Sequence, residues 1–245
     1  MPGRKVKSVE KTFELLVQLS ELGTATPTTL ANQMEMPVST VHDYLSTLEE
    51  IQYAVEDEGK YSVSARVLYF GWKVRENSQL FEVAKPVAKE LSRDLNEQVT
   101  VGVIEGNEII YIYTHSDNDR LSIYIQPGVL LPLHTGASGI VALAHLSDEA
   151  QREYIRETNT DVSGKTPTEE ELDTIREQGY ATGRYQRGTE SIAAPIQYKD
   201  EIVGTISVVA SSNHMKEESV RERITERLLD AANLIRINMV EDIQT

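Results

Sequence analysis

The stretch that decides the fold is Met36–Glu50, which reads MPVSTVHDYLSTLEE. At about 100° per residue, a helix here places Val41, Leu45 and Leu48 on one side. The other side and its flanks carry small polar side chains near the N-terminal end: Ser39, Thr40, His42 and Asp43. The pattern fits an ordinary surface helix, or a helix whose N-terminal half is free to enter a groove.

The neighbouring segments favour the second interpretation. Apolar side chains recur at helical spacing over Ser8–Leu22, which predicts an amphipathic helix that ends at Gly23. Thr26-Pro27 is a helix start signal, so Thr28–Met34 is predicted as a second, short helix. Two strand-like runs around Glu58-Gly59 predict a hairpin. Two helices, a turn, a third helix and a hairpin form the pattern of a winged helix-turn-helix.

The composition excludes several classes of protein. The chain has 245 residues, 40% of them hydrophobic, which is enough for packed cores. It contains no cysteine, so disulfides, thiolate metal sites and thiol nucleophiles are excluded. No apolar run approaches the ~20 residues of a membrane span, and the basic start lacks the apolar core of a secretory signal. We therefore expect a cytoplasmic protein with no membrane contact.

The net charge of −15 is unevenly distributed. Residues 1–75 carry eight Lys/Arg and ten Asp/Glu, whereas residues 76–245 carry sixteen and twenty-nine. Arg4, Lys5 and Lys7 form a short basic arm with no acid among them. A nucleic-acid-binding protein usually has a more basic surface, so the low positive charge of this chain argues against DNA binding. High salt screens attraction to phosphate, so we hypothesise an acidic protein of a salt-rich, halophilic cell.

The rest of the chain predicts an α+β domain, an antiparallel sheet with flanking helices. Hairpins are predicted at Glu105-Gly106-Asn107 and at Lys199-Asp200, a third strand within 120–128, and a closing helix over Glu217–Ile237. Thr168 is expected to cap a helix that begins with three glutamates. The domain assignment is therefore 1–75, a winged helix-turn-helix, and 76–245, a second domain with a linker helix at its start.

The segment 65–96 is helical in character, with a break expected near Pro86. This segment carries four large apolar residues: Leu68, Phe70, Trp72 and Leu80. They form a dimer contact, or they cover the core of the hairpin domain, and the two interpretations are compatible.

Motifs for catalysis are missing from the sequence. The five histidines form no HxxxH or HExxH pattern, and neither a phosphate-binding glycine loop nor a GxSxG elbow occurs. Ser138 could act as a nucleophile only with His134 as its base, and a serine at a helix start is more often a cap. We therefore expect no enzymatic activity, no cofactor and no metal.

Two segments of the second domain favour ligand binding. The small residues of HTGASG, 134–139, let a ligand approach the backbone, and the following helix N-terminus favours an anion. The alternative is a simple strand-to-helix corner. Arg184 and Arg187 lie in the predicted loop GRYQRGTES, where they could clamp a carboxylate or merely balance local acid.

With these features in place, the chain resembles the isocitrate-lyase-regulator (IclR) family of transcription factors over nearly its whole length. The resemblance rests on the shared order of several segments: SVEKTFELL, PVSTVHDYLSTLE, GKYSVSARVLYFG, AKPVAKEL, LPLHTGASGIVAL and GYATGRYQRGTESIAAPI…GTISV. It implies a winged helix-turn-helix, a linker helix that dimerises, and a GAF-like effector domain. It also implies a homodimer or dimer of dimers that binds double-stranded DNA and a small-molecule effector.

The resemblance also implies two sets of site residues. On the DNA side they are Ser39, Thr40, His42, Lys60 and Tyr61, to which the basic arm adds Arg4 and Lys5. On the effector side they are Ile123, Ala137, Ser138, Ser191 and Ser207. Two further candidates depart from the family pattern: Asp43, which could accept from a cytosine amino group, and Arg184, which hints at an anionic ligand. The expected function is a DNA-binding regulator whose operator affinity is set by an organic or sugar-derived acid. The alternative is a ligand-binding or protein-docking module whose winged helix no longer binds DNA.

Overall fold

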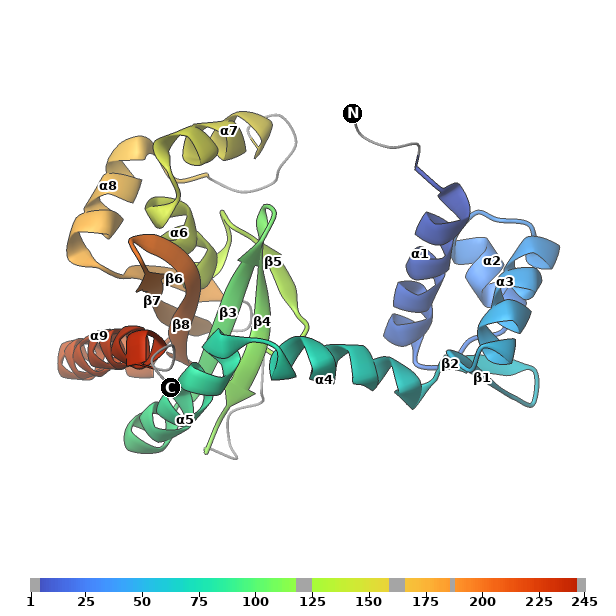
Figure 1. Cartoon of the computed structure of the whole chain (residues 1–245), viewed down its shortest axis with the longest axis horizontal. Coiled ribbons are helices and arrows are strands. Elements are labelled where there is room, and N and C mark those ends of the chain that lie inside the picture. The colour runs from blue at the N-terminus through green and yellow to red at the C-terminus, as the bar shows by residue number, and fades with distance from the viewer. Residues whose placement is uncertain (1–4, 118–124, 159–165, 186–187, 242–245) are drawn as a thin grey trace. The chain divides into compact units, whose positions relative to one another are not determined.

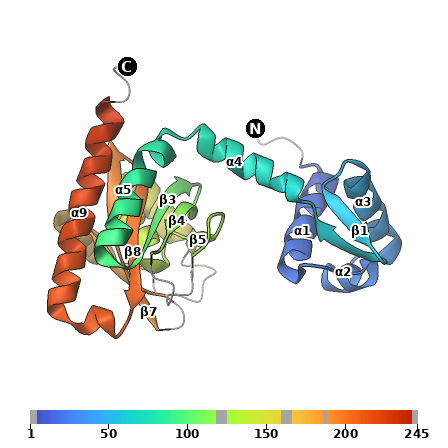
Figure 2. The ribbon, with the colours of Figure 1, turned by 90° about the horizontal axis from the view of Figure 1, so that it is seen from below.

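The computed structural model describes residues 5–117, 125–158, 166–185 and 188–241, and it separates into two compact units. The first unit comprises Met1–Val74 and the second Arg75–Thr245 (Figures 1 and 2). None of the helices in the described ranges is both long enough and apolar enough to cross a membrane.

The first unit, the winged unit, is built from three helices and a hairpin. Its elements in chain order are α1 (Lys7–Leu22), α2 (Pro27–Gln33), α3 (Val38–Glu50), β1 (Ala54–Asp57) and β2 (Lys60–Val63). Thr26 accepts a hydrogen bond from the Thr29 N–H and caps α2, as its position before Pro27 predicts. The hairpin turns at Glu58 and Gly59, both with positive φ, which fits a two-residue hairpin turn.

One apolar cluster holds the winged unit together. Leu15 and Leu19 of α1, Leu30 of α2, and Leu45 of α3 are fully buried in it. The hairpin closes the cluster through Ala54 and Tyr61, and the backbone of Tyr61 pairs with that of Ala25. The predicted winged helix-turn-helix is confirmed in element order and in the face that α3 buries.

The linker region departs from its prediction. A short 3₁₀ turn (Ala65–Val67) leads into α4 (Leu68–Glu76), and α5 (Gln79–Leu95) begins where Ser78 accepts a hydrogen bond from the Phe81 N–H. The break expected near Pro86 is therefore wrong, because Pro86 lies inside α5. Its side chain is exposed, so the interruption of the helix faces solvent rather than the core.

The second unit, the effector unit, is a six-stranded antiparallel sheet in the order β5-β4-β3-β8-β7-β6. The strands are β3 (Gln98–Glu105), β4 (Glu108–His115), β5 (Leu130–Pro132), β6 (Ala181–Tyr185), β7 (Thr189–Tyr198) and β8 (Glu201–Ser211). Both predicted hairpins are present, and the second turns at Lys199 and Asp200, which have positive φ. The third strand expected within 120–128 falls largely outside the described residues.

Helices cover both faces of this sheet (Figures 1 and 2). One face packs on α5 and the long α9 (Glu218–Glu241), which follows a 3₁₀ turn (His214–Lys216) and fits the predicted closing helix. The other face packs on α6 (Gly136–His145), flanked by α7 (Asp148–Thr158) and α8 (Glu169–Gln178). Thr168 and Glu171 form the capping box of α8, so the predicted cap is confirmed. The fold is α+β, as expected.

Candidate DNA-reading and effector-binding surfaces

Helix α3 separates an apolar face from a polar one. Val41, Leu45 and Leu48 are buried in the winged unit, whereas the N-terminal half of the opposite face is open. The side chains there are exposed, except for the half-buried Thr40: Ser39, Thr40, His42 and Asp43. His42 Nδ1 lies 3.4 Å from Ser46 Oγ one turn further on, which favours an outward ring. The surface thus carries hydrogen-bond donors and acceptors on a rigid helix, as base-edge recognition requires.

The basic arm is partly compensated by acid. Lys5 is exposed, and its Nζ lies 3.5 Å from Glu10 Oε1. Arg4 lies outside the described residues. An exposed ion pair of this kind is weak, so Lys5 remains able to exchange its partner for a phosphate.

Lys60, the expected phosphate contact of the hairpin, lies among acidic residues. Lys60 is exposed, but Asp57 stands directly opposite it in the strand register. Glu56 Oε1 accepts the Gly59 N–H at 2.6 Å, and Glu58 is exposed at the turn. Three carboxylates thus share the hairpin with Lys60 and offset its positive charge, which weakens its attraction to phosphate.

Tyr61 requires a correction. It was expected on the DNA surface beside Lys60, yet only 6% of the residue is exposed. Successive residues of a strand point to opposite faces, so an exposed Lys60 turns Tyr61 inward against the helices. Tyr61 is therefore a core residue of the winged unit.

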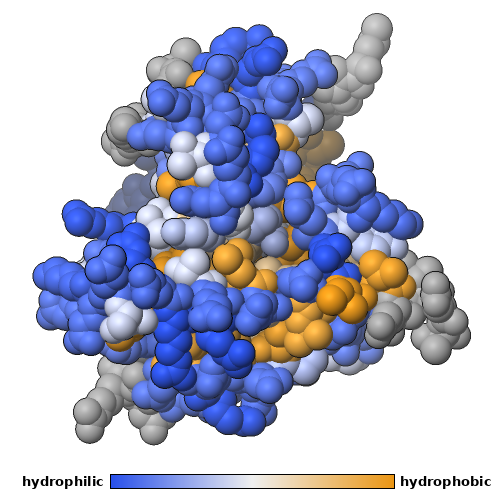
Figure 3. Space-filling view, turned by 90° about the vertical axis from the view of Figure 1, so that its left-hand side faces the viewer, coloured by the Kyte–Doolittle hydropathy of each residue, from blue (hydrophilic) through white to orange (hydrophobic). Residues whose placement is uncertain are grey.

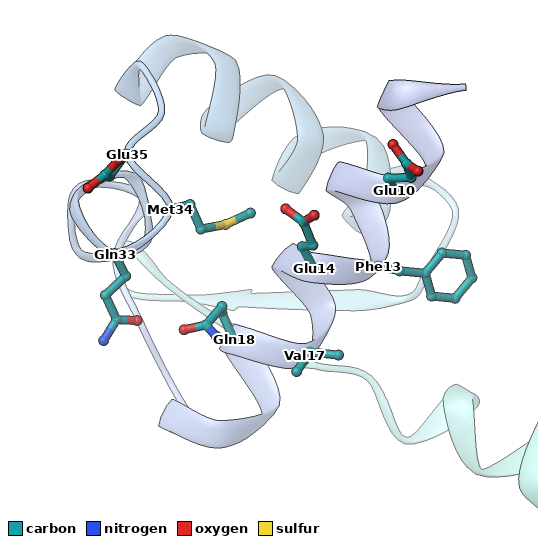
Figure 4. A pocket seen from close by; sticks show the side chains of 8 residues that line it. All are labelled: Glu10, Phe13, Glu14, Val17, Gln18, Gln33, Met34 and Glu35. Atoms are coloured by element: carbon teal, nitrogen blue, oxygen red, sulfur yellow. The ribbon is translucent and has the colours of Figure 1, made fainter. Parts of the chain in front are cut away.

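An open groove of about 720 Å³ lies between α1 and the end of α2. Glu10, Glu14 and Glu35 line it together with Gln18, Gln33 and three apolar side chains. Figure 4 shows Met34 reaching toward α1, while Phe13 points away from α2. Three carboxylates make this groove unsuited to DNA or to an acidic effector.

In the effector unit, α6 begins at the predicted glycine turn. Gly136 has φ +65°, and Thr135 donates its hydroxyl to Pro132 O at 2.7 Å instead of capping the helix. Ala137 and Ser138 follow in the first turn, and both are buried. Gly183 of β6 packs on this turn so closely that a Cβ there would lie 2.4 Å from Ala137 N. The structure thus brings Ala137 and Ser138 against the sheet.

The sheet face under α6 is polar at its centre. Ser207 of β8 pairs in register with Thr100 of β3, and their hydroxyl oxygens lie 2.7 Å apart. Ser191 of β7 points to the same face and donates to Gly183 O at 3.4 Å. All three residues are buried. The expected Ser138, Ser191 and Ser207 therefore gather on the two sides of one layer, between α6 and the sheet.

Sequence reasoning missed three neighbours in this layer. Thr100, Thr114 and Thr205 share the face of Ser207, as the strand registers require. The signal was present as an alternation of hydroxyl and apolar side chains along Thr205-Ile206-Ser207-Val208, with both faces of the strand buried. A strand buried on both faces normally reads as a continuous apolar run.

The two arginines do not join this layer in the way expected. Arg184 lies in strand β6 rather than in a loop, with 90% of its side chain exposed and its Nε 3.7 Å from Glu190 Oε1. Arg187 and Ile123 lie outside the described residues. Within the described part of the chain, the sheet face under α6 therefore carries hydroxyl and apolar groups and the buried amide of Gln98.

His134 is not paired with Ser138. Its Nδ1 lies 2.7 Å from the hydroxyl of Tyr154, which also accepts the His134 N–H at 3.0 Å. Burial lowers the pKa of His134 and raises the pKa of Tyr154. This pair anchors α7 to the segment before α6. Across the described ranges, no group of three His, Asp or Glu side chains could hold a metal ion.

Two family models match this chain. The family model of the IclR helix-turn-helix domain matches residues 8–58, and that of the bacterial transcriptional regulator IclR C-terminal matches 73–237. The transcriptional regulator KipR of Bacillus subtilis is 29% identical over 93% of this chain and 95% of its own. The transcriptional regulator KdgR of Escherichia coli is 28% identical over 89% of this chain and 88% of its own.

Solved structures share the fold. The IclR structure of Thermotoga maritima superposes with a TM-score of 0.75 over 95% of this chain and 98% of its own, at 21% identity. An IclR homologue from Microbacterium hydrocarbonoxydans, complexed with 4-hydroxybenzoate, also has a TM-score of 0.75. The match covers 94% of this chain and 98% of the homologue, at 21% identity.

Proposed function

The chain belongs to the IclR family of DNA-binding transcriptional regulators with a C-terminal effector-binding domain, and on that premise we propose how this member works. Ser39, Thr40, His42 and Asp43 of α3 read base edges in the major groove, with Lys5 and Lys60 nearest the phosphates. A small organic or sugar-derived acid binds under α6 and changes the affinity for the operator. Ligand and DNA are linked because each favours one placement of the two α3 helices of a dimer.

One observation carries the DNA proposal. The N-terminal half of α3 is open within its own unit, while Val41, Leu45 and Leu48 fix the helix in place. A rigid helix with exposed hydroxyl, imidazole and carboxylate groups supplies the partners that base edges need. Asp43 can accept from a cytosine amino group, which would give the site a preference for G·C pairs.

The test is a footprint on genomic fragments selected by the wild-type chain. Replacing both Thr40 and His42 with alanine should weaken specific binding by about 100-fold, since each base contact contributes ~1–3 kcal/mol. The matched control is Thr47→Ala with Glu50→Ala, at the exposed C-terminal end of the same helix. An unchanged footprint in the Thr40/His42 variant would refute the assignment. Failure of the wild-type chain to select any fragment would favour the docking module instead.

The effector site is proposed at the layer under α6. It comprises Ala137 and Ser138 from the helix and Ser191 and Ser207 from the sheet, with Arg184 as an outer residue; the expected Ile123 lies outside the described residues. The buried hydroxyls support this, as does the uncapped first turn of α6, whose N–H groups favour a carboxylate. A thermal-shift panel of sugar acids and aromatic acids tests it, because a ligand stabilises only the native state that binds it.

We also propose that the chain forms a homodimer through α4. Five large apolar side chains of this helix are more than half exposed: Leu68, Tyr69, Phe70, Trp72 and Val74. Leu80, once expected beside them, is buried in the effector unit and leaves this set. Replacing both Leu68 and Trp72 with serine should convert the dimer to a monomer in analytical ultracentrifugation. An unchanged sedimentation coefficient would place the contact elsewhere.

A second apolar surface supports a dimer of dimers. Figure 3 shows an orange band on a largely hydrophilic face, and α9 exposes Leu234, Ile237 and Val240. Contiguous apolar surface of this kind is typical of interaction sites. Replacing Leu234 and Ile237 with serine should lower a tetramer to a dimer while the α4 contact is kept.

Finally, the acidic composition supports a cytoplasmic role in a salt-rich cell. With ten acidic residues against eight basic ones in residues 1–75, counterion release contributes little to binding. Operator affinity should therefore persist at molar potassium chloride. Loss of all binding above ~0.3 M salt would reject this setting.

A further inference from the structure

Two buried hydroxyls of the effector unit have no hydrogen-bond partner among the described residues. They belong to Thr114 at the end of β4 and Thr205 of β8, and neither oxygen is accessible to solvent. Thr205 is fully buried as a residue. A buried hydroxyl without a partner destabilises the fold, so such groups are rare and call for an explanation.

Strand register places both hydroxyls in one patch. Thr114 stands opposite Thr100, and Thr100 stands opposite Ser207, so these three share a row across β4, β3 and β8. Thr205 lies two residues before Ser207 on the same face. The central pair, Thr100 and Ser207, is already hydrogen-bonded at 2.7 Å. The hydroxyl of Thr114, at the β4 end of the row, and that of Thr205, in the next row opposite Gly102, remain unsatisfied.

The patch has a definite length and chemistry. Three neighbouring strands span about 10 Å, close to the length of an extended five- or six-carbon chain. The four polar groups of the row and of Thr205 are hydroxyls, which can both donate and accept, and the neighbouring buried amide of Gln98 donates to Ile125 O at 3.1 Å. Ala193 of β7 stands opposite Ser207 and packs in one small apolar cluster with Ala137 of α6, so the patch borders small apolar side chains on this side.

We propose that Thr114 and Thr205 are specificity-determining residues that select an effector with several adjacent hydroxyl groups over an aromatic or unsubstituted acid. This rests on the proposed effector site under α6. A polyhydroxylated chain that runs from Thr114 across the row and turns along β8 to Thr205 supplies both missing partners. An aromatic ring or alkyl chain leaves these hydroxyls unsatisfied, and a site built for hydroxyl groups rejects such analogues strongly.

The first experiment compares three carboxylates by isothermal titration calorimetry with the full chain. Gluconate and hexanoate both have six carbons and differ in their hydroxyl groups, and 4-hydroxybenzoate represents the aromatic class. Gluconate should bind at least about tenfold more tightly than either competitor. Equal affinity for gluconate and hexanoate would overturn the inference.

The second experiment uses Thr205→Val, which keeps the shape and removes the hydroxyl. It should weaken gluconate binding by about fivefold to tenfold and leave hexanoate unaffected. The unliganded protein should melt at a higher temperature, because a buried unsatisfied group has been removed. Thr114→Val should act in the same direction, and the exposed Thr182→Val on β6 is the matched control that changes neither quantity.

The outcomes separate this inference from the function beneath it. A Thr205→Val variant that melts lower and binds gluconate normally would show that the hydroxyl serves the fold alone. If hexanoate or 4-hydroxybenzoate binds best and releases DNA, effector control stands and the inference about hydroxyl groups fails. If none of the three binds, the inference fails while the footprint of α3 remains a separate measurement.

Discussion

The polar functional groups are exposed to solvent in the winged unit and buried in the effector unit. In the winged unit, α3 turns its polar residues outward and keeps an apolar core behind them. In the effector unit, hydroxyl groups lie inside, between a helix and a sheet whose buried side chains are mostly apolar. An outward polar face costs little to fold, whereas an inward one is stable only when its hydrogen bonds are satisfied. Stability and ligand recognition are therefore coupled in the effector unit and nearly independent in the winged unit.

The largest effect is expected from a substitution in the core of the winged unit, which tests whether the two units unfold independently. Leu45→Ala removes a fully buried side chain and should lower the free energy of unfolding of that unit by ~2–5 kcal/mol. Calorimetry should show one early transition moving down while the transition of the effector unit stays in place. A common shift of both transitions would mean that the units unfold together.

A matching change in the effector unit is Gly183→Ala. The added Cβ would lie 2.4 Å from Ala137 N, so β6 or the first turn of α6 must move. We expect a loss of ~1–3 kcal/mol and a weaker effector response with DNA binding retained. The control is Gly71→Ala in α4, where the added carbon meets nothing within 4 Å and should stabilise the helix by ~0.5–1 kcal/mol.

The acidic hairpin offers a sharper test of the outward surface. Asp57→Asn with Glu58→Gln removes two negative charges beside Lys60 without changing side-chain size. Affinity for a random-sequence duplex should rise about threefold to tenfold at low salt, with a steeper salt dependence. Glu170→Gln with Glu201→Gln, in the effector unit, controls for net charge alone. A random duplex bound equally by both pairs of variants would show that the hairpin stays away from DNA.

Acid should loosen the inward-facing unit first. Burial lowers the pKa of His134 in the folded state, so the unfolded chain binds its proton more readily. The resulting stability is full above the ordinary histidine pKa of ~6.5 and is lost as pH falls below it. His134→Gln should flatten the pH dependence of effector-unit unfolding between about pH 7 and 5. An identical pH profile in the variant would assign the effect to other groups.

The smallest effect is expected for Arg184→Ala. Its side chain is 90% exposed and its partner Glu190 lies 3.7 Å away, so the loss in stability should be below ~0.5 kcal/mol. The response to an acidic effector should weaken by less than about threefold if Arg184 is only an outer residue. A tenfold loss would show that the arginine reaches the ligand.

The winged unit was predictable because its signals are local. The apolar spacing of Val41, Leu45 and Leu48 fixes which face of α3 is buried, and Thr26-Pro27 fixes where α2 begins. The prediction for Tyr61 was wrong because the sequence of a short hairpin does not show which of its two faces packs on the helices.

The effector unit was less predictable because its determinants are distant in sequence. Arg184 was expected in a loop, and β6 is a strand because it pairs with β7. A break was expected near Pro86, but α5 continues through this residue because the helix packs on the sheet. The buried row of Thr114, Thr100 and Ser207 forms only when strands far apart in sequence meet.

The neighbouring position of β3 and β8 has a consequence for synthesis of the chain. Gln98 pairs with Val209, so the centre of the sheet cannot close until more than a hundred residues have emerged between them. The winged unit is complete by Val63 and can fold while the remainder is still being translated. A nascent regulator should therefore acquire its DNA-reading helix well before it can sense any metabolite, and a chain cut short ahead of β8 would keep the first ability without the second.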